Sequence, residues 1–226
     1  MNIHINIILF CFGLFYVQSN CEGPILPNTY SQDFHRIMYG PKQIYNDNDG
    51  KVWYDYTNQR ARYDYIEPQH ERLCQDQDLS PDNPEDTCHI IFAESGAMYA
   101  HYPNQESCCR YCEPGLFCTV LRPDWMINAT FVGTEVVEES ECNVYSIAGF
   151  QTNYWAQTED GVPCRYWISL PNDDFPIVHD NKTYNQGSFS LDPIPDSVFE
   201  IPEYCDRPCP NPACPPVCPD KKIVLF

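Results

Sequence analysis

The chain has few basic residues: 13 Lys and Arg stand against 32 Asp and Glu, which gives a formal net charge of -19 at pH 7. Nucleic acid and anionic membrane surfaces would repel such a chain, so the composition argues against both as partners. Solubility is the simplest reason for the charge. With 16 Tyr and 12 Phe, the chain still has enough apolar side chain to form a folded core.

Long apolar runs are also scarce. The one extended run, residues 7–17, is shorter than the roughly 20 residues that a membrane-spanning helix needs, and it is followed by Gln18 and Ser19. We therefore predict a secretory signal peptide over residues 1–19 and an exported protein that is not stably inserted in a membrane. Sequons at Asn128 and Asn181 fit this route, and we predict that both asparagines are glycosylated.

The sequence lacks the usual catalytic signatures, including H-E-x-x-H, G-x-S-x-G and the P-loop. Two D-x-D triplets, at 47–49 and 76–78, resemble the metal-binding motif of glycosyltransferases. A chain with 32 acidic residues produces such triplets by chance, and no carboxylate pair stands out for glycoside hydrolysis. We predict a non-enzymatic protein without metal or cofactor, and we keep a glycosyltransferase or hydrolase as a weak alternative.

Cysteine, in contrast, is abundant. One of the 14 cysteines, Cys11, lies in the predicted signal peptide, which leaves an odd number for the exported chain. Cysteines in exported proteins form disulfides, and an odd number implies a free thiol or a link to a partner chain. Adjacent Cys108 and Cys109 cannot easily bridge each other, so we expect each to pair elsewhere.

Alternating aromatic segments dominate the rest of the chain. Residues 151–157 and 163–170 flank an Asp-Gly turn, which predicts a β-hairpin because glycine readily takes the positive φ of such turns. Residues 51–56 and 60–65 predict a second hairpin, and the polar stretch 46–51 before it is expected to be a turn. No convincing run has helical periodicity, so we predict a mostly β, antiparallel domain.

The composition changes near the C-terminus. Prolines separate Cys205, Cys209, Cys214 and Cys218, a pattern that indicates a rigid tail cross-linked to itself or to a neighbour. Zinc binding is the alternative, but the spacing lacks the C-x2-C pairs typical of zinc sites. We place the β domain at 20–205 and a disulfide-rich tail at 206–226, which we expect to be dispensable for folding.

Four motifs stand out along the domain: LRPDW at 121–125, ECNVY at 141–145, YWAQTEDGVPCRYW at 154–167 and the Tyr-Cys end of the domain at 204–205. They resemble motifs of a family of secreted plant and protist proteins. The resemblance covers roughly residues 34–205 and implies no catalytic residues. More loosely, YDYTNQRARYDY leading to Cys74, and SVFEIPEYC, resemble the ependymin-related proteins, which have a LolA-like open antiparallel half-barrel around an apolar pocket.

The second resemblance implies a curved, open sheet and a bridge between Cys74 and Cys205. A single-layer half-barrel leaves one face uncovered, so we predict an apolar pocket on the concave face that holds a lipid-like molecule. The alternative is two sheets packed face to face, with the same aromatic rings as ordinary core, in a structural matrix protein cross-linked through its tail. The predicted pocket residues are Trp53, Tyr145, Trp155 and Trp167.

Overall fold

The computed structural model of the chain describes residues 23–39, 44–68, 71–75, 86–115, 118–149, 152–169 and 179–210. Within these residues, eleven antiparallel strands form a single open sheet, which confirms the predicted mostly β fold class. The alternative of two packed sheets is not what the described residues form. The strands are β1 (Thr29–Tyr39), β2 (Ile44–Asp55), β3 (Arg60–Ile66), β4 (Thr87–Phe92), β5 (Met98–Tyr102), β6 (Ser107–Cys112), β7 (Thr130–Val137), β8 (Ser140–Ile147), β9 (Thr152–Gln157), β10 (Pro163–Ser169) and β11 (His179–Tyr184).

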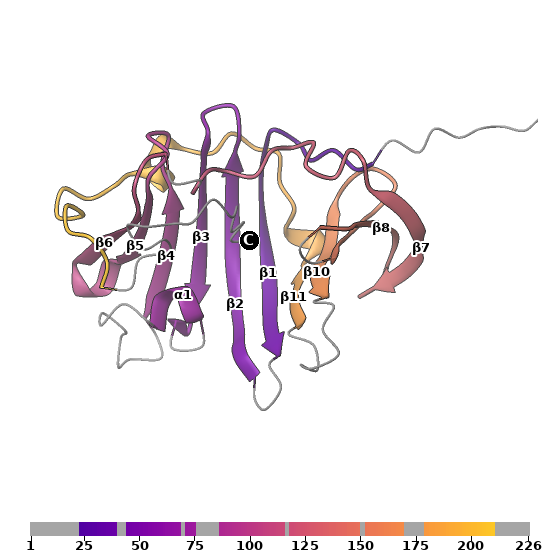
Figure 1. Ribbon diagram of the computed structural model, residues 1–226, viewed down its shortest axis with the longest axis horizontal. Coiled ribbons are helices and arrows are strands. Elements are labelled where there is room, and N and C mark those ends of the chain that lie inside the picture. Colours follow the sequence, from indigo (N-terminus) through magenta and orange to yellow (C-terminus); the bar gives the residue numbers. More distant parts are fainter. Residues whose placement is uncertain are drawn as a thin grey trace, which may run out of the picture.

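The sheet consists of two meanders that meet at the centre (Figure 1). Strands β1 to β6 follow one another toward one edge, and β11 back to β7 follow one another toward the other edge. The two halves join where β1 pairs with β11. The remaining described elements are short: α1 (Arg72–Gln75) and the 3-10 turns Pro103–Gln105, Gln186–Ser188 and Asp196–Phe199.

Both predicted hairpins are confirmed. β2 and β3 pair across residues 56–59, and β9 and β10 pair across residues 158–162, where Gly161 has a φ of 88°. The predicted turn at 46–51 is wrong, because β2 begins at Ile44 and pairs with β1 throughout this stretch. The stretch is compatible with a strand because its backbone pairs with β1 throughout and with β3 at Gly50 and Lys51.

One face of the sheet, which we call the core face, carries most of the buried side chains. In β1 the alternate residues Tyr30, Gln32, Phe34 and Arg36 are all buried, and the residues between them are partly exposed. This period of two continues through the neighbouring strands and puts a row of aromatic rings on one side. The other aromatic residues buried in this cluster are Tyr54, Tyr65, Tyr102, Tyr111, Trp155, Tyr166 and Tyr184.

Loop segments cover the core face. Figure 1 shows the segment 118–129, which contains the LRPDW motif, running across the upper ends of the strands from the β6 side to β7. The Tyr54 hydroxyl donates a hydrogen bond to Leu121 O (2.6 Å), and Trp125 packs on Trp155 and Tyr166. The LRPDW motif therefore closes the core face.

A second segment, residues 185–208, returns from β11 to β6. It first pairs with β1 where Ser190 bridges Ser31, and its later part lies on the opposite face, which we call the outer face. Arg62 on that face donates to Val198 O (2.9 Å), and Arg60 lies over the Phe199 ring at 4.4 Å. The segment ends beside β6, where Arg110 forms a parallel bridge with Pro208. The edge strand β6 is therefore covered by the chain itself.

Five disulfides are present among the described residues: Cys74–Cys88, Cys108–Cys205, Cys109–Cys209, Cys112–Cys118 and Cys142–Cys164. Cys108 and Cys109 each pair elsewhere, as expected. The predicted Cys74–Cys205 bridge is wrong, because the chain brings Cys74 beside β4 and Cys205 beside β6 at the sheet edge. Cys209 is likewise tied to β6, so the predicted tail boundary at 206 falls within a segment that is attached to the sheet. The other cysteines lie outside the described residues.

Candidate functional site

Four charged side chains are buried together in the middle of the core face. Arg36 comes from β1, Asp180 and Lys182 come from β11, and Glu71 immediately precedes α1; none is more than 6% exposed. The pairing of β1 with β11 sets Arg36 opposite Lys182, with Met38 opposite Asp180, so these side chains project from neighbouring positions of one face. Buried charge is costly unless it is paired, so the pairing within this cluster matters.

Arg36 is fully paired. Its Nε and Nη2 atoms donate to Asp180 Oδ1 and Oδ2 at 2.9 and 2.8 Å, and its Nη1 donates to Glu71 Oε2 at 2.8 Å. Burial alone would lower the pKa of Arg36, but Glu71 and Asp180 raise it well above its ordinary value. This arginine therefore stays charged and engages both carboxylates of the cluster.

Lys182 is different, because it forms no hydrogen bond or ion pair with any described residue. Its Nζ lies over the rings of Phe34 at 4.7 Å and Tyr63 at 4.6 Å. Burial, followed by Arg36, lowers the pKa of Lys182 to about 8, while Asp180 and Glu71 oppose the shift. The ammonium group is thus held between two aromatic faces without a counter-ion in direct contact.

Two amide side chains on the same face also have unsatisfied atoms. Asn48 is 3% exposed, and neither its Nδ2 nor its Oδ1 has a hydrogen-bond partner among the described residues. Gln32 donates to Pro163 O at 3.0 Å and to Asn185 O at 3.1 Å, but its Oε1 is unpaired within the same part of the chain. Each such buried atom costs about 1 to 3 kcal/mol of folding free energy, so these atoms stand out against ordinary packing.

Tyrosine hydroxyl groups surround the cluster. Burial raises the pKa of Tyr63 to about 12, with Arg36 opposing the shift, and burial followed by Glu71 raises that of Tyr65 well above its ordinary value. Both phenols therefore stay protonated and able to donate. Neither hydroxyl forms a hydrogen bond with a described residue. The site combines aromatic rings, hydrogen-bond donors and a cation, which suits a molecule with an apolar body and a polar group.

The structure does not bring the four predicted pocket residues together. Tyr145 and Trp155 are opposite each other on the core face. Trp53 and Trp167 project from the outer face, where Trp53 contacts Lys51 and Arg62 and Trp167 stacks on Tyr154 at 4.9 Å. Because adjacent strand residues point to opposite faces, the sequence left open which residues share a side. Only Tyr145 and Trp155 remain candidates for the predicted pocket.

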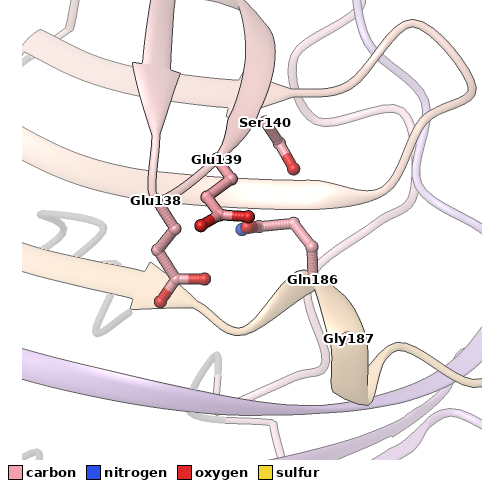
Figure 2. Close-up of a pocket in the computed structure, with 5 residues that line it drawn as sticks. All are labelled: Glu138, Glu139, Ser140, Gln186 and Gly187. Carbon is pink, nitrogen blue, oxygen red and sulfur yellow. The ribbon is translucent and has the colours of Figure 1, made fainter.

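A separate open pocket of about 380 Å³ lies where the β7–β8 turn approaches the segment after β11. Its lining is polar, and Figure 2 shows the Gln186 side chain pointing toward Glu139, with Glu138 and Ser140 nearby. None of the predicted pocket residues lines it. Carboxylates and an amide do not suit an apolar ligand, so this pocket is not the predicted site.

Sequence reasoning missed the residues that distinguish the core face. Asp180, Lys182 and Tyr184 alternate along β11, which is the signal of one face of a strand. The same stretch contains the Asn181 sequon, which drew attention to the asparagine instead of the lysine. The partners of Lys182 could not be found from sequence, because Phe34 and Tyr63 belong to strands far along the chain.

Two further observations concern membranes and metals. No helix among the described residues is long and apolar enough to cross a membrane. Within the same residues, no cluster of three or more His, Cys, Asp or Glu side chains is placed to hold a metal ion. Cys205 and Cys209 are oxidised in disulfides with β6, so they are not zinc ligands in this structure.

Comparisons with known proteins were made on both sequence and structure. No curated protein matches the sequence. Similar solved structures include an uncharacterized conserved protein from Thermus thermophilus, with 10% identity over 78% of this chain and 86% of that chain (TM-score 0.45). They also include the LolA superfamily protein NE2245 from Nitrosomonas europaea, with 11% identity over 78% of this chain and 92% of that chain (TM-score 0.41).

A third similar structure is a putative outer membrane lipoprotein-sorting protein domain from Vibrio parahaemolyticus. It has 5% identity over 76% of this chain and 89% of that chain (TM-score 0.35). A LolA-superfamily structure is thus among the similar structures, and the resemblance to secreted plant and protist proteins stays a prediction. A family model described as Domain of unknown function (DUF8395) matches residues 29–205, most of the chain, and the protein belongs to that family.

Proposed function

We propose that the protein is a secreted, non-enzymatic binding protein that holds a small molecule with an apolar or lipid-like body against the core face. The observation that carries this proposal is the presence of buried, unsatisfied polar atoms of Asn48 and Gln32 among the aromatic rings of that face. A purely structural core would be more stable with apolar residues at these positions. A bound molecule would give these atoms a partner.

The arrangement of the cover supports entry of such a molecule. The described segments above the core face are loops and the four-residue helix α1, and no second sheet lies there among the described residues. Loops open at a lower free energy than strands in the middle of a sheet. The proposal therefore requires the segment 118–129 to open from the sheet while the sheet itself remains intact.

Export of the protein is supported by its cysteines. Five intrachain bridges among the described residues require an oxidising compartment, which agrees with the predicted signal peptide and sequons. An extracellular carrier or receptor of this kind needs neither a metal nor a cofactor. Its expected partner is the small molecule.

A second candidate is a structural or matrix component linked to other chains by disulfides. The specific observation in its favour is that Cys21, Cys214 and Cys218, an odd number, are the cysteines outside the five bridges once Cys11 is removed with the signal peptide. At least one of these thiols is then free to join a partner chain. A non-reducing gel of the secreted protein measures this directly.

The proposed binding function is tested with the full secreted protein. Native mass spectrometry should detect a co-purifying molecule, and the delipidated protein should bind an environment-sensitive fatty-acid probe saturably. Trp155→Phe on the core face should weaken probe binding, whereas Trp167→Phe on the outer face should leave it unchanged. Absence of both a co-purifying molecule and saturable binding would overturn the proposal and leave the structural candidate.

A further inference from the structure

We propose that the molecule bound at the core face carries an anionic head group, and that Lys182 and Asn48 bind that head group. This inference rests on the proposed binding function and names the chemical class of the ligand. The class is an amphipathic monoanion, such as a long-chain carboxylate, whose apolar part lies along the aromatic rings. The argument starts from the pairing of charges within the buried cluster.

The cluster contains two cations and two carboxylates, but the direct contacts are unequal. Arg36 binds Asp180 through two hydrogen bonds and Glu71 through a third. Among the described residues, Lys182 contacts only the ring faces of Phe34 and Tyr63. An ammonium group has three N–H donors, and ring faces satisfy them weakly compared with an anionic oxygen. Lys182 is therefore the member of the cluster with unused capacity for an anion.

The ordinary explanation for such a lysine is that its head group reaches solvent past an apolar surface. Only 6% of Lys182 is exposed, so the end of its side chain has little contact with solvent. A buried ammonium without a carboxylate partner is costly, and a ligand anion at the same place would offset this cost because Coulomb interactions are strong away from water. The lowered pKa of Lys182, about 8, agrees with an unpaired position.

The close packing of side chains and backbone beside Lys182 also supports a preformed binding site. Gly50 on β2 pairs with Phe34 on β1, and a Cβ at Gly50 would lie 2.5 Å from the Phe34 ring. The ring thus lies directly on the backbone of β2, and the Lys182 side chain extends over it toward Tyr63 on β3. Asn48 lies on the same face of β2, opposite Arg36, with its Nδ2 free to donate.

The preference for an anionic head group can be measured separately from the binding of the apolar chain. Displacement of the fluorescent fatty-acid probe is measured with three competitors of equal chain length: dodecanoate, dodecyl phosphate and dodecanol. The parent protein should bind the two anions at least about tenfold more tightly than the alcohol, since hydrogen bonds to charged groups are stronger than those to neutral ones. Equal affinity for acid and alcohol would overturn the head-group assignment while the binding function stands.

Lys182→Met provides the decisive variant, because methionine keeps an unbranched apolar stem and leaves the Asn181 sequon intact. It should lose the preference for anions and keep the affinity for dodecanol. Lys51→Met is the matched control, since Lys51 also lies over a ring, that of Trp53 at 5.4 Å, but on the outer face. Lys51→Met should keep the full preference.

Two further measurements keep the test conclusive. Lys182→Arg, which retains the charge, should preserve part of the preference, and circular dichroism confirms that each variant is folded. Binding of dodecanoate near pH 8 should take up protons, because an anion raises the pKa of Lys182; calorimetry in buffers of different ionisation enthalpy measures this uptake. An unchanged preference in Lys182→Met would contradict the assignment. Failure of all three competitors and the probe to bind would instead contradict the proposed function itself.

Discussion

The indole ring of Trp125 packs edge-on against that of Trp155, with ring centroids 6.1 Å apart and planes at 85°. Trp125 belongs to the segment that crosses the core face, whereas Trp155 lies on β9 in the sheet beneath it. Tyr166 on β10 completes the contact, with its ring 6.0 Å from that of Trp125. The Trp125 side chain therefore contacts two strands of the sheet and adds to the hydrogen bond from Tyr54 to Leu121 O in the same motif.

Trp125→Ala should lower the free energy of unfolding by about 2 to 3 kcal/mol, since it removes a large, partly buried ring from an aromatic cluster. Urea denaturation followed by circular dichroism measures the change. Trp53→Ala is the control, because its ring lies against Lys51 and Arg62 on the outer face, and its cost should stay below about 1 kcal/mol. Equal losses in the two variants would show that the LRPDW segment does not anchor the cover.

Arg36→Leu should be strongly destabilising. It removes the arginine that pairs with two buried carboxylates, Glu71 and Asp180, and breaking a buried ion pair on one side costs about 3 to 5 kcal/mol. Arg122→Leu is the control. Arg122 also donates two hydrogen bonds to one carboxylate, that of Asp124, but at an exposed site, so the melting temperature should hardly change. A small effect of Arg36→Leu would mean that the carboxylates are solvated or protonated.

The pH dependence of stability should carry a contribution from two histidines on the outer face. Burial, followed by Arg62, lowers the pKa of His89 to about 3 and that of His101 to about 4. His89 also faces Asp64 at 3.6 Å, and His101 contacts Tyr204. In the unfolded chain both histidines take up protons near pH 6.5. Between that pH and about 4 the unfolded state binds more protons, so stability falls as pH falls.

The double variant His89→Gln and His101→Gln should therefore lose stability less steeply than the parent between pH 6.5 and about 4. The midpoint of urea unfolding, measured every half pH unit, gives the two slopes. Carboxylates contribute to acid unfolding in both proteins, so the difference between the slopes reports the histidines. Parallel curves would indicate that the histidines are protonated in the folded protein.

Truncation of the chain should separate the attached part of the tail from the rest. A protein ending after Pro210 keeps both bridges to β6, and its secretion and melting temperature should match the parent. A protein ending after Cys205 leaves Cys109 unpaired and should melt at a lower temperature. The loss in free energy of unfolding should be smaller than the roughly 4 to 5 kcal/mol expected for a single disulfide that closes a 100-residue loop, because the Cys108–Cys205 bridge still closes nearly the same loop.

A matched control for the unpaired thiol is Cys109→Ala in the protein that ends after Cys205. It distinguishes loss of the bridge from damage by a free thiol. Retention and degradation of the protein that ends after Pro210 would show that residues 211–226 are needed for folding, against the prediction made for the tail. An unchanged melting temperature after truncation at Cys205 would show that the second bridge adds no stability.

The two sequons should differ in occupancy. Asn128 is exposed beside the start of β7, whereas Asn181 is half-buried in β11 and its Oδ1 accepts a hydrogen bond from Arg165 Nε at 2.7 Å. A glycan is attached at Nδ2, which needs space beside this half-buried contact, so we predict full occupancy at Asn128 and partial occupancy at Asn181. Peptide mass spectrometry after enzymatic deglycosylation measures both, with Thr130→Ala and Thr183→Ala as controls. Equal occupancy would show that Asn181 is modified before β11 pairs.

Local signals in the sequence determined the fold class and both aromatic hairpins. An Asp-Gly turn and the alternation of apolar and polar residues are both signals within a few residues. Strands and their alternation can therefore be predicted without the rest of the chain. The geometry of adjacent cysteines likewise determined that Cys108 and Cys109 pair elsewhere. The predicted turn at 46–51 was wrong because pairing with β1 overrides the local preference of these residues.

Only the tertiary structure decided which of the two alternating sets of residues in each strand faces the core, and which cysteines form disulfides. Alternation says that Trp167 and Tyr166 face opposite ways, but only the pairing of β10 with β9 and β11 shows that Tyr166 is on the core face. Cys74 bridges Cys88 because α1 lies beside β4, a consequence of the order of strands in the sheet. Lys182 meets Phe34 and Tyr63 for the same reason: β11 pairs with β1, and contacts between residues so distant in sequence depend on the whole chain having folded.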